Sequence, residues 1–227
     1  MMKYLNLIFL CILVFLVSCG GPSGASRTER TEAEHHAQVA DAIMNGNQLN
    51  NKNLLKAYNE YEKSIHGYRD DERELAKIIL KQGIILHMLG RHTKAVNKFK
   101  KSIKYSPRIR KPYLYLVKSY IKLNNPKAAI YWSNRAIDKI SDFSEMNFYA
   151  GEMYYKLGKY IKSETAFQKA IDNGLEGKFL NRARYRISQI RKILRNNAED
   201  ISVDISKYLN KNILTFNDVA IIIFLYH

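Results

Sequence analysis

Residues 154–171, YYKLGKYIKSETAFQKAI, contain a spaced series of small and large residues that decides the fold. Gly158 is followed by Ser163 and, four residues later, by Phe167, while Gly151 precedes the stretch. When the sequence is compared with itself at a shift of 34 residues, and then at a second such shift, similar residues recur without a slip in register. A constant period of this size is typical of repeat architectures. We therefore expect three consecutive units, 76–109, 110–143 and 144–177.

The first and third units share the pattern closely, and the second departs from it. Gly83, Gly90 and Phe99 of the first unit correspond to Gly151, Gly158 and Phe167 of the third. The second unit has Val117, Asn124 and Ser133 at those positions, and Trp132, one position before the missing aromatic residue, is a candidate to fill its space.

This spacing of small and aromatic residues resembles the tetratricopeptide repeat (TPR). The resemblance covers about 100 residues and implies an all-α, TPR-type α-solenoid of antiparallel helix pairs. Small residues would let the helix backbones approach closely, and the aromatic residue would fill the gap left between pairs. Gly90 and Gly158 would supply the conformation that ends a helix.

The flanks of the repeat are predicted to be end pieces. We expect a degenerate helix pair over 33–75 and a C-terminal capping helix over 178–196, with apolar residues on one face and arginines on the opposite, outer face. The structure of the tail, 197–227, stays open: one short helix near 202–212 is expected. Its last nine residues, VAIIIFLYH, are too few to span a bilayer.

The N-terminus is predicted to direct export. Residues 1–18 have a lysine followed by an apolar run too short for a confident membrane span, and the sequence LVSCG around Cys19 resembles the lipobox of bacterial lipoproteins. This implies cleavage before Cys19, lipid (palmitate-type) attachment to it, and a tether over 19–32. The alternative is an ordinary signal peptide. Cys11 would be removed, so neither a disulfide nor a cysteine metal site can form within the mature chain.

The chain is strongly basic, with a net charge of +16. Between Leu75 and Ile137 there is no acidic residue, against fifteen lysines and arginines. Two interpretations stay open: a solvated surface in a lysine-rich proteome, or a basic surface for an acidic protein, anionic lipid or envelope polymer. Nucleic acid is a poor candidate partner for an exported chain.

The TPR resemblance also implies a partner-binding groove lined by the first helix of each pair. Two of its positions, Leu80 and Leu114, are apolar where a carboxylate clamp would need polar donors, so we expect an amphipathic helix or extended peptide as ligand. The groove positions are Lys77, Leu80, Ile84, His87, Lys111, Leu114, Lys118, Ile121, Glu145, Phe148, Glu152 and Tyr155.

The sequence contains no recognisable catalytic motif, and we predict no enzyme, no cofactor, no metal site and no small-molecule substrate. His35 and His36 are adjacent, but a metal site needs more converging ligands. The predicted function is a membrane-anchored protein–protein interaction scaffold in the bacterial cell envelope. It would serve outer-membrane protein assembly or pilus and secretion assembly. The outer membrane is favoured over the inner, and the face of that membrane stays open. The alternative is a surface or periplasmic lipoprotein that binds polyanionic or host ligands through its basic surface.

Overall fold

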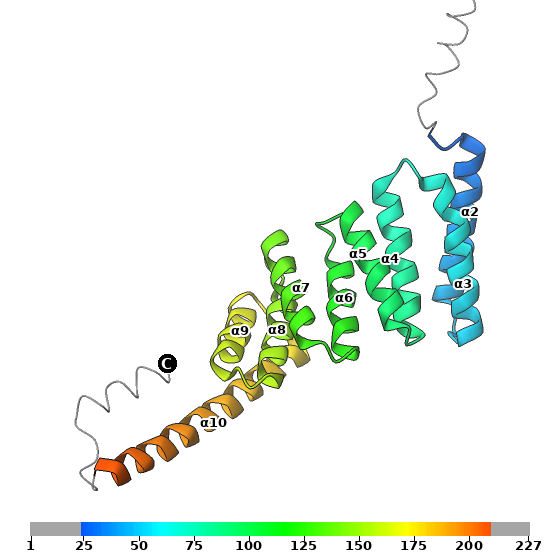
Figure 1. Ribbon diagram of the computed structural model, residues 1–227. Helices are drawn as coiled ribbons and strands as arrows, with labels where there is room; N and C mark the ends of the chain where they lie inside the picture. The colour runs from blue at the N-terminus through cyan, green and yellow to red at the C-terminus, as the bar shows by residue number, and fades with distance from the viewer. Residues whose placement is uncertain (1–23, 210–227) are drawn as a thin grey trace, which may run out of the picture. The chain divides into compact units, whose positions relative to one another are not determined.

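The computed structural model describes the backbone of residues 24–209 and the side chains of residues 24–199 (Figure 1). This part of the chain is helical and contains no strand, and it divides into an N-terminal unit that ends at Pro107 and a C-terminal unit that begins at Arg108. No helix within 24–209 has the length and hydropathy of a membrane span. The N-terminal unit contains α2 (Arg27–Asn45), α3 (Asn51–Ser64), the 3-10 helix η1 (Ile65–Tyr68), α4 (Glu72–Met88) and α5 (His92–Tyr105). The C-terminal unit contains α6 (Arg110–Lys122), α7 (Pro126–Lys139), α8 (Ser144–Lys156), α9 (Tyr160–Asp172) and α10 (Gly177–Leu209).

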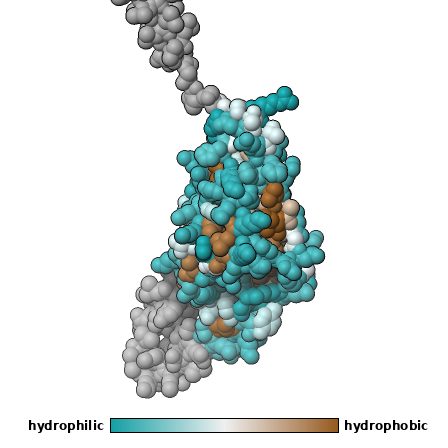
Figure 2. Space-filling model, turned by 90° about the vertical axis from the view of Figure 1, so that its right-hand side faces the viewer, coloured by the Kyte–Doolittle hydropathy of each residue, from teal (hydrophilic) through white to brown (hydrophobic). Residues whose placement is uncertain are grey.

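Within each unit, helices that follow one another along the chain pack side by side. The pairs α2 and α3, α4 and α5, α6 and α7, and α8 and α9 are all neighbours, and α10 packs on α9. Hydrophilic residues cover most of the face drawn in Figure 2, and apolar residues show through it in separate patches. The buried apolar side chains, such as Ile79, Phe99 and Phe167, form the core between the helices.

The first and third repeat units, which we call the outer units, are each held together by a close approach between a glycine and a phenylalanine. Gly83 and Phe99 are fully buried, and a Cβ atom placed on Gly83 would lie 2.5 Å from the Phe99 ring. A Cβ atom on Gly151 would lie 2.9 Å from the Phe167 ring. Real Cβ atoms do not come this close to carbon, so the aromatic ring occupies the volume that a larger side chain would need. The ring therefore packs over the small residue of its own helix pair, and not only in a gap between pairs.

In the second repeat unit, formed by α6 and α7, the larger of the two residues is on the first helix and the smaller is on the second. Val117 stands at the glycine position and Ser133 at the phenylalanine position, and both are completely buried. The larger residue has moved from the second helix to the first, which conserves volume approximately. Trp132 is partly buried, and its ring lies 6.4 Å from that of Tyr113 in the first helix of the same pair. The Ser133 hydroxyl has no hydrogen-bond partner in the described part of the chain.

The turns inside the helix pairs share one backbone conformation. Gly90 and Gly158 have φ values of +73° and +67°, and Asn124 has +52°. Asparagine tolerates this left-handed region better than most residues. In each turn the following N–H bonds back to a carbonyl five residues earlier, as from Asn125 to Tyr120 at 2.9 Å. The departure at Asn124 therefore leaves the helix-ending turn intact.

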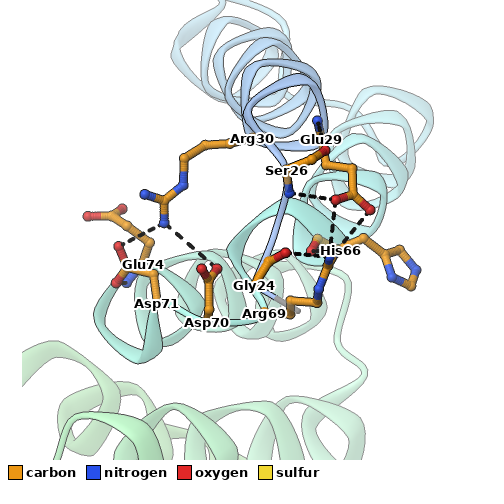
Figure 3. A network of polar contacts seen from close by, with 9 residues as sticks. All are labelled: Gly24, Ser26, Glu29, Arg30, His66, Arg69, Asp70, Asp71 and Glu74. Carbon is orange, nitrogen blue, oxygen red and sulfur yellow. Dashed lines mark hydrogen bonds and ion pairs between the residues drawn. The ribbon is translucent and has the colours of Figure 1, made fainter. Parts of the chain in front are cut away.

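The first helix begins earlier than the sequence analysis predicted. Helix α2 starts at Arg27, inside the segment 19–32 that was expected to be a tether, because Ser26 and Glu29 form a capping box. Figure 3 shows the contacts around this start. The Arg69 guanidinium donates to the Gly24 carbonyl at 3.0 Å and to both carboxylate oxygens of Glu29 at 3.0 and 3.1 Å. Residues 24–32 thus belong to the folded N-terminal unit.

The last helix is longer than predicted. Helix α10 runs without a break from Gly177 to Leu209, whereas the sequence analysis ended a capping helix at 196 and placed a separate short helix near 202–212. No glycine or proline between 178 and 209 interrupts it. The signal segment, Cys19 and the apolar stretch 219–227 lie outside the described residues.

We predict that Val117→Gly and Ser133→Phe each destabilise the chain but partly compensate when combined. Val117→Gly opens a cavity and adds helix-interior flexibility, at about 3 kcal/mol, and Ser133→Phe overpacks the site by about 1–3 kcal/mol. The double variant recreates the glycine–phenylalanine contact of the outer units, so the coupling free energy is expected to favour it by about 0.5–3 kcal/mol. Urea unfolding of the four proteins measures this, and strictly additive losses would contradict the contact.

Candidate functional site

A pocket of about 610 Å³ lies in the C-terminal unit between α6, α8 and the start of α10. We call it the groove pocket, because four of the predicted groove positions line it. Its lining residues are Lys118 and Ile121 of α6, Phe148, Tyr149, Glu152 and Met153 of α8, and Lys178, Phe179 and Arg182 of α10.

The structure distributes the twelve predicted groove positions over the two units. Lys118, Ile121, Phe148 and Glu152 line the groove pocket. Lys111, Leu114, Glu145 and Tyr155 lie on the same two helices, α6 and α8, outside its lining. Lys77, Leu80, Ile84 and His87 lie on α4, in the N-terminal unit.

The α4 positions already have neighbours within their own unit. Leu80 is buried, and Lys77 forms an ion pair with Glu74 one helical turn earlier. The His87 ring lies 4.9 Å from the ring of His92. We take the groove pocket as the candidate site, because four of the predicted positions line this one pocket.

The floor of the groove pocket is aromatic. The ring of Phe148 lies 5.5 Å from that of Tyr149 and 5.0 Å from that of Phe179, both nearly edge-to-face. Phe148 is also 5.7 Å from Phe167, the phenylalanine that packs on Gly151. The pocket floor is thus continuous with the core of the third repeat unit. Phe148 itself is 3% exposed, so the partly exposed rings of Tyr149 and Phe179 are the ones that an apolar ligand group can contact.

One wall of the pocket is a closed ion-pair network. The Arg182 guanidinium contacts both oxygens of Glu152, at 3.1 and 2.6 Å, and Arg186 contacts the same carboxylate at 3.2 Å. Arg186 also lies 4.4 Å over the ring of Tyr155. The Arg182 side chain stays 56% exposed, and that of Arg186 26% exposed, while both pair with the carboxylate that α8 presents. Glu152 is not a free acid in the groove.

Two lysines leave the pocket with excess positive charge. Neither Lys118 nor Lys178 forms an ion pair with any side chain in the range 24–199. Burial lowers the pKa of Lys118, and the like charge of Lys178 lowers it further, whereas Glu145 opposes the change. The surroundings of Lys118 and Lys178 therefore favour the binding of a negatively charged group beside them.

Tyr149 adds a neutral hydroxyl to the same pocket. Burial, with a smaller contribution from Glu145, raises the pKa of Tyr149 to about 12. The phenol is consequently protonated at neutral pH and can donate or accept a hydrogen bond. The groove pocket thus combines apolar contact, two unpaired cations and a hydroxyl, which suits non-covalent binding.

The sequence analysis missed the contribution of α10 to the pocket. Lys178, Phe179 and Arg182 fall just after the third repeat unit, and they were assigned only to a capping helix. Lys178 stands at the first position of a further 34-residue period, so extending the period by one unit was the signal that could have placed these residues beside α8.

The histidine pair His35–His36 does not form a site of its own. His36 Nδ1 lies 2.7 Å from a carboxylate oxygen of Glu60, and His35 is exposed. Within the described residues, no group of three or more His, Cys, Asp or Glu could hold a metal ion.

Solved structures with the same fold are TPR proteins. A tetratricopeptide repeat protein from Parabacteroides merdae superposes with a TM-score of 0.62 at 12% identity, over 78% of this chain and 67% of that one. The MamA protein superposes with a TM-score of 0.60 at 19% identity, over 82% and 97%. YrrB, described as a TPR protein with an unusual peptide-binding site, gives 0.57 at 16% identity, over 75% and 80%. The predicted TPR-type α-solenoid is therefore confirmed as the fold.

Comparisons of the sequence itself identified no relative. No family model matches the chain, and no curated protein matches it either.

We predict that Lys178→Gln raises the pKa of Lys118 and that Glu145→Gln lowers it further. The first change removes a like charge that disfavours the ammonium, and the second removes an opposite charge that favours it. Titration of the Lys118 side chain by heteronuclear NMR measures both directions. Lys178→Arg keeps the charge and serves as the matched control. An unchanged Lys118 pKa in Lys178→Gln would show that the two lysines do not share the pocket electrostatically.

Proposed function

We propose that this chain is a protein–protein interaction scaffold that holds a polypeptide segment of a partner in the groove pocket. The observation that carries the proposal is the pairing of an aromatic floor with two lysines, Lys118 and Lys178, that have no anionic neighbour within ion-pair distance in the described part of the chain. A fold shared with TPR proteins, one of them described as having a peptide-binding site, supports it.

The chemistry of the pocket defines the partner segment. An apolar or aromatic side chain fits against Tyr149 and Phe179, and an acidic side chain fits between Lys118 and Lys178. A volume of about 610 Å³ accommodates a few side chains of an extended or helical segment, not a folded domain. The proposal assigns no catalytic residue, and binding requires no covalent step.

The proposed setting is the bacterial cell envelope, with the chain anchored through lipid on Cys19. The lipobox-like sequence around this residue supports the anchor. Since Gly24 already contacts Arg69, only the four residues 20–23 would separate the lipidated cysteine from the folded unit. We propose the outer membrane rather than the inner one, and a role as an accessory to outer-membrane protein assembly or to pilus and secretion assembly. The size of the chain supports this role, by analogy with lipoproteins of similar fold.

A second candidate function is supported by the exposed face of α5. This helix carries five lysines and no acidic residue, and Lys94, Lys101 and Lys104 are exposed without an ion pair to any described side chain. Such a face would attract an acidic polymer or anionic head groups by long-range electrostatics. This binding would depend on salt much more steeply than binding in a pocket with an aromatic floor.

We predict that partner contacts in the groove pocket survive moderate salt and are lost in Lys118→Gln/Lys178→Gln. A photo-crosslinking residue at Ile121, on the pocket lining, reports these contacts in membranes that contain the full-length chain. Adducts are expected at about 0.3 M salt, where screening reduces surface attraction. Lys94→Gln/Lys101→Gln removes the same charge from α5 and is the matched control. Adducts that vanish with salt and with the α5 variant, but persist in the pocket variant, would support the second candidate instead.

The lipid anchor has its own test. Cells grown with labelled palmitate are expected to label the wild-type chain and not Cys19→Ser, and the variant is expected to leave the membrane fraction, since a chain without acyl groups lacks the anchor. Unlabelled wild-type protein in the soluble fraction would contradict this part of the proposal. That result would not bear on the proposal that the groove pocket binds a partner segment.

A further inference from the structure

A second pocket, of about 620 Å³, lies in the C-terminal unit between α7, α8 and α9. We call it the α7–α9 pocket. Its α8 residues are Asn147, Ala150 and Tyr154, whereas the groove pocket uses Phe148, Tyr149, Glu152 and Met153 of the same helix. At about 100° of rotation per residue, these two sets lie on opposite faces of α8. The α7–α9 pocket is therefore separate from the groove pocket.

Asn147 brings to the α7–α9 pocket an amide that makes no hydrogen bond within the described residues. Asn147 is 7% exposed, and its carboxamide forms no hydrogen bond with any group in the described residues. The amide oxygen and nitrogen are not among the buried side-chain atoms that lack a partner, so they are open to water in the pocket. A ligand that enters the pocket can therefore replace water at both of these atoms. The Asn147 amide can donate and accept at the same time.

The surroundings of Asn147 combine apolar and charged groups. Ile161, on α9, is 62% exposed at the pocket wall, which is unusual for a large apolar residue. Lys162 and Lys169 of α9 and Asp138 of α7 line the same pocket, and none of them forms an ion pair with a described side chain. The pocket thus has a net positive charge of one from these three groups, with an apolar contact surface beside it.

We propose that the α7–α9 pocket is a second docking site, which binds an extended polypeptide segment through its main chain. The Asn147 carboxamide pairs with the N–H and C=O of one ligand residue, because a primary amide matches a peptide unit in both donor and acceptor. The side chain of that residue packs on Ile161. An acidic side chain nearby lies against Lys162 or Lys169.

A peptide fits this pocket better than the other ligands that a polar pocket suggests. A free anion would leave the exposed Ile161 without a contact, and would use only the donor half of the Asn147 amide. A sugar would pair with the amide, but sugar sites usually present an aromatic face, and Tyr154 is the only aromatic residue in this lining. This inference goes beyond the proposed function, since it concerns the opposite face of α8.

The test uses peptides selected from a displayed library of random 12-residue sequences on the full-length chain. The dissociation constant of each synthetic peptide is measured on the wild type, on Asn147→Leu and on Lys118→Gln/Lys178→Gln. We expect one class of peptides to lose about tenfold or more in affinity on Asn147→Leu, equivalent to about 1.4 kcal/mol. The same class is expected to bind the lysine variant within about twofold of the wild type.

A measurement on the wild-type chain keeps the test independent of the stability of the variant. With asparagine labelled with ¹⁵N, the Asn147 side-chain amide resonances are expected to shift when a peptide of this class is added, and to stay unshifted with N-acetylglucosamine or inorganic phosphate. Asn147→Leu is expected to melt close to the wild-type temperature, because the Asn147 amide makes no hydrogen bond within the described residues that the substitution could remove.

The outcomes separate this inference from the proposed function. Peptides that respond only to Lys118→Gln/Lys178→Gln would overturn the second docking site and leave the groove pocket standing. Peptides that lose affinity only on Asn147→Leu would support the second docking site and would contradict peptide binding in the groove pocket. A shift of the Asn147 resonances by the sugar or by phosphate alone, or a large loss of stability in Asn147→Leu, would also overturn the inference.

Discussion

The close approach of two helix backbones at a glycine–phenylalanine contact is the constraint on which the other features depend. Gly151 lets the Phe167 ring lie where a Cβ atom would otherwise be, and Phe167 in turn contacts Phe148, the floor of the groove pocket. A buried ring in a close-packed interior has little freedom to move, so the contact that holds the pair together also fixes the pocket floor. The candidate site is therefore a direct product of the packing that defines the repeat.

The second repeat unit shows that the repeat conserves volume and turn geometry rather than residue identity. Val117 and Ser133 exchange the large and small positions, and both remain fully buried. Asn124 adopts the same positive φ as the glycines that occupy its position in the outer units. A three-unit period can thus persist through a unit in which all three signature residues differ. The exchange leaves the buried Ser133 hydroxyl without a hydrogen-bond partner in the described part of the chain.

Helix α8 organises the chemistry of the C-terminal unit, because its two faces line two different pockets. On the groove side, Glu152 is neutralised by Arg182 and Arg186, which leaves Lys118 and Lys178 as the cations available to a ligand. On the other side, Asn147 brings an unused amide beside the exposed Ile161. The two pockets differ in character: one is aromatic and cationic, and the other is built around a main-chain-like polar group.

The sequence by itself determined the period and the all-helical fold, since small and aromatic residues at a constant spacing encode local helix pairing. Of the eight positions that it predicted on α6 and α8, four line the groove pocket, and Tyr149 and Met153 line it without having been predicted. The sequence could not assign the ion pairs of Glu152 or the unpartnered state of Asn147. Nor did it show that Val117 compensates for Ser133. These features arise between residues that are distant in the chain, and only the packing of one helix on another decides which side chains meet. The early start of α2 was within reach of the sequence, through Ser26 and Glu29, whereas the Arg69 contacts that fix Gly24 were not. Local propensity therefore determined the elements, and tertiary contact decided which of their side chains remain free to bind.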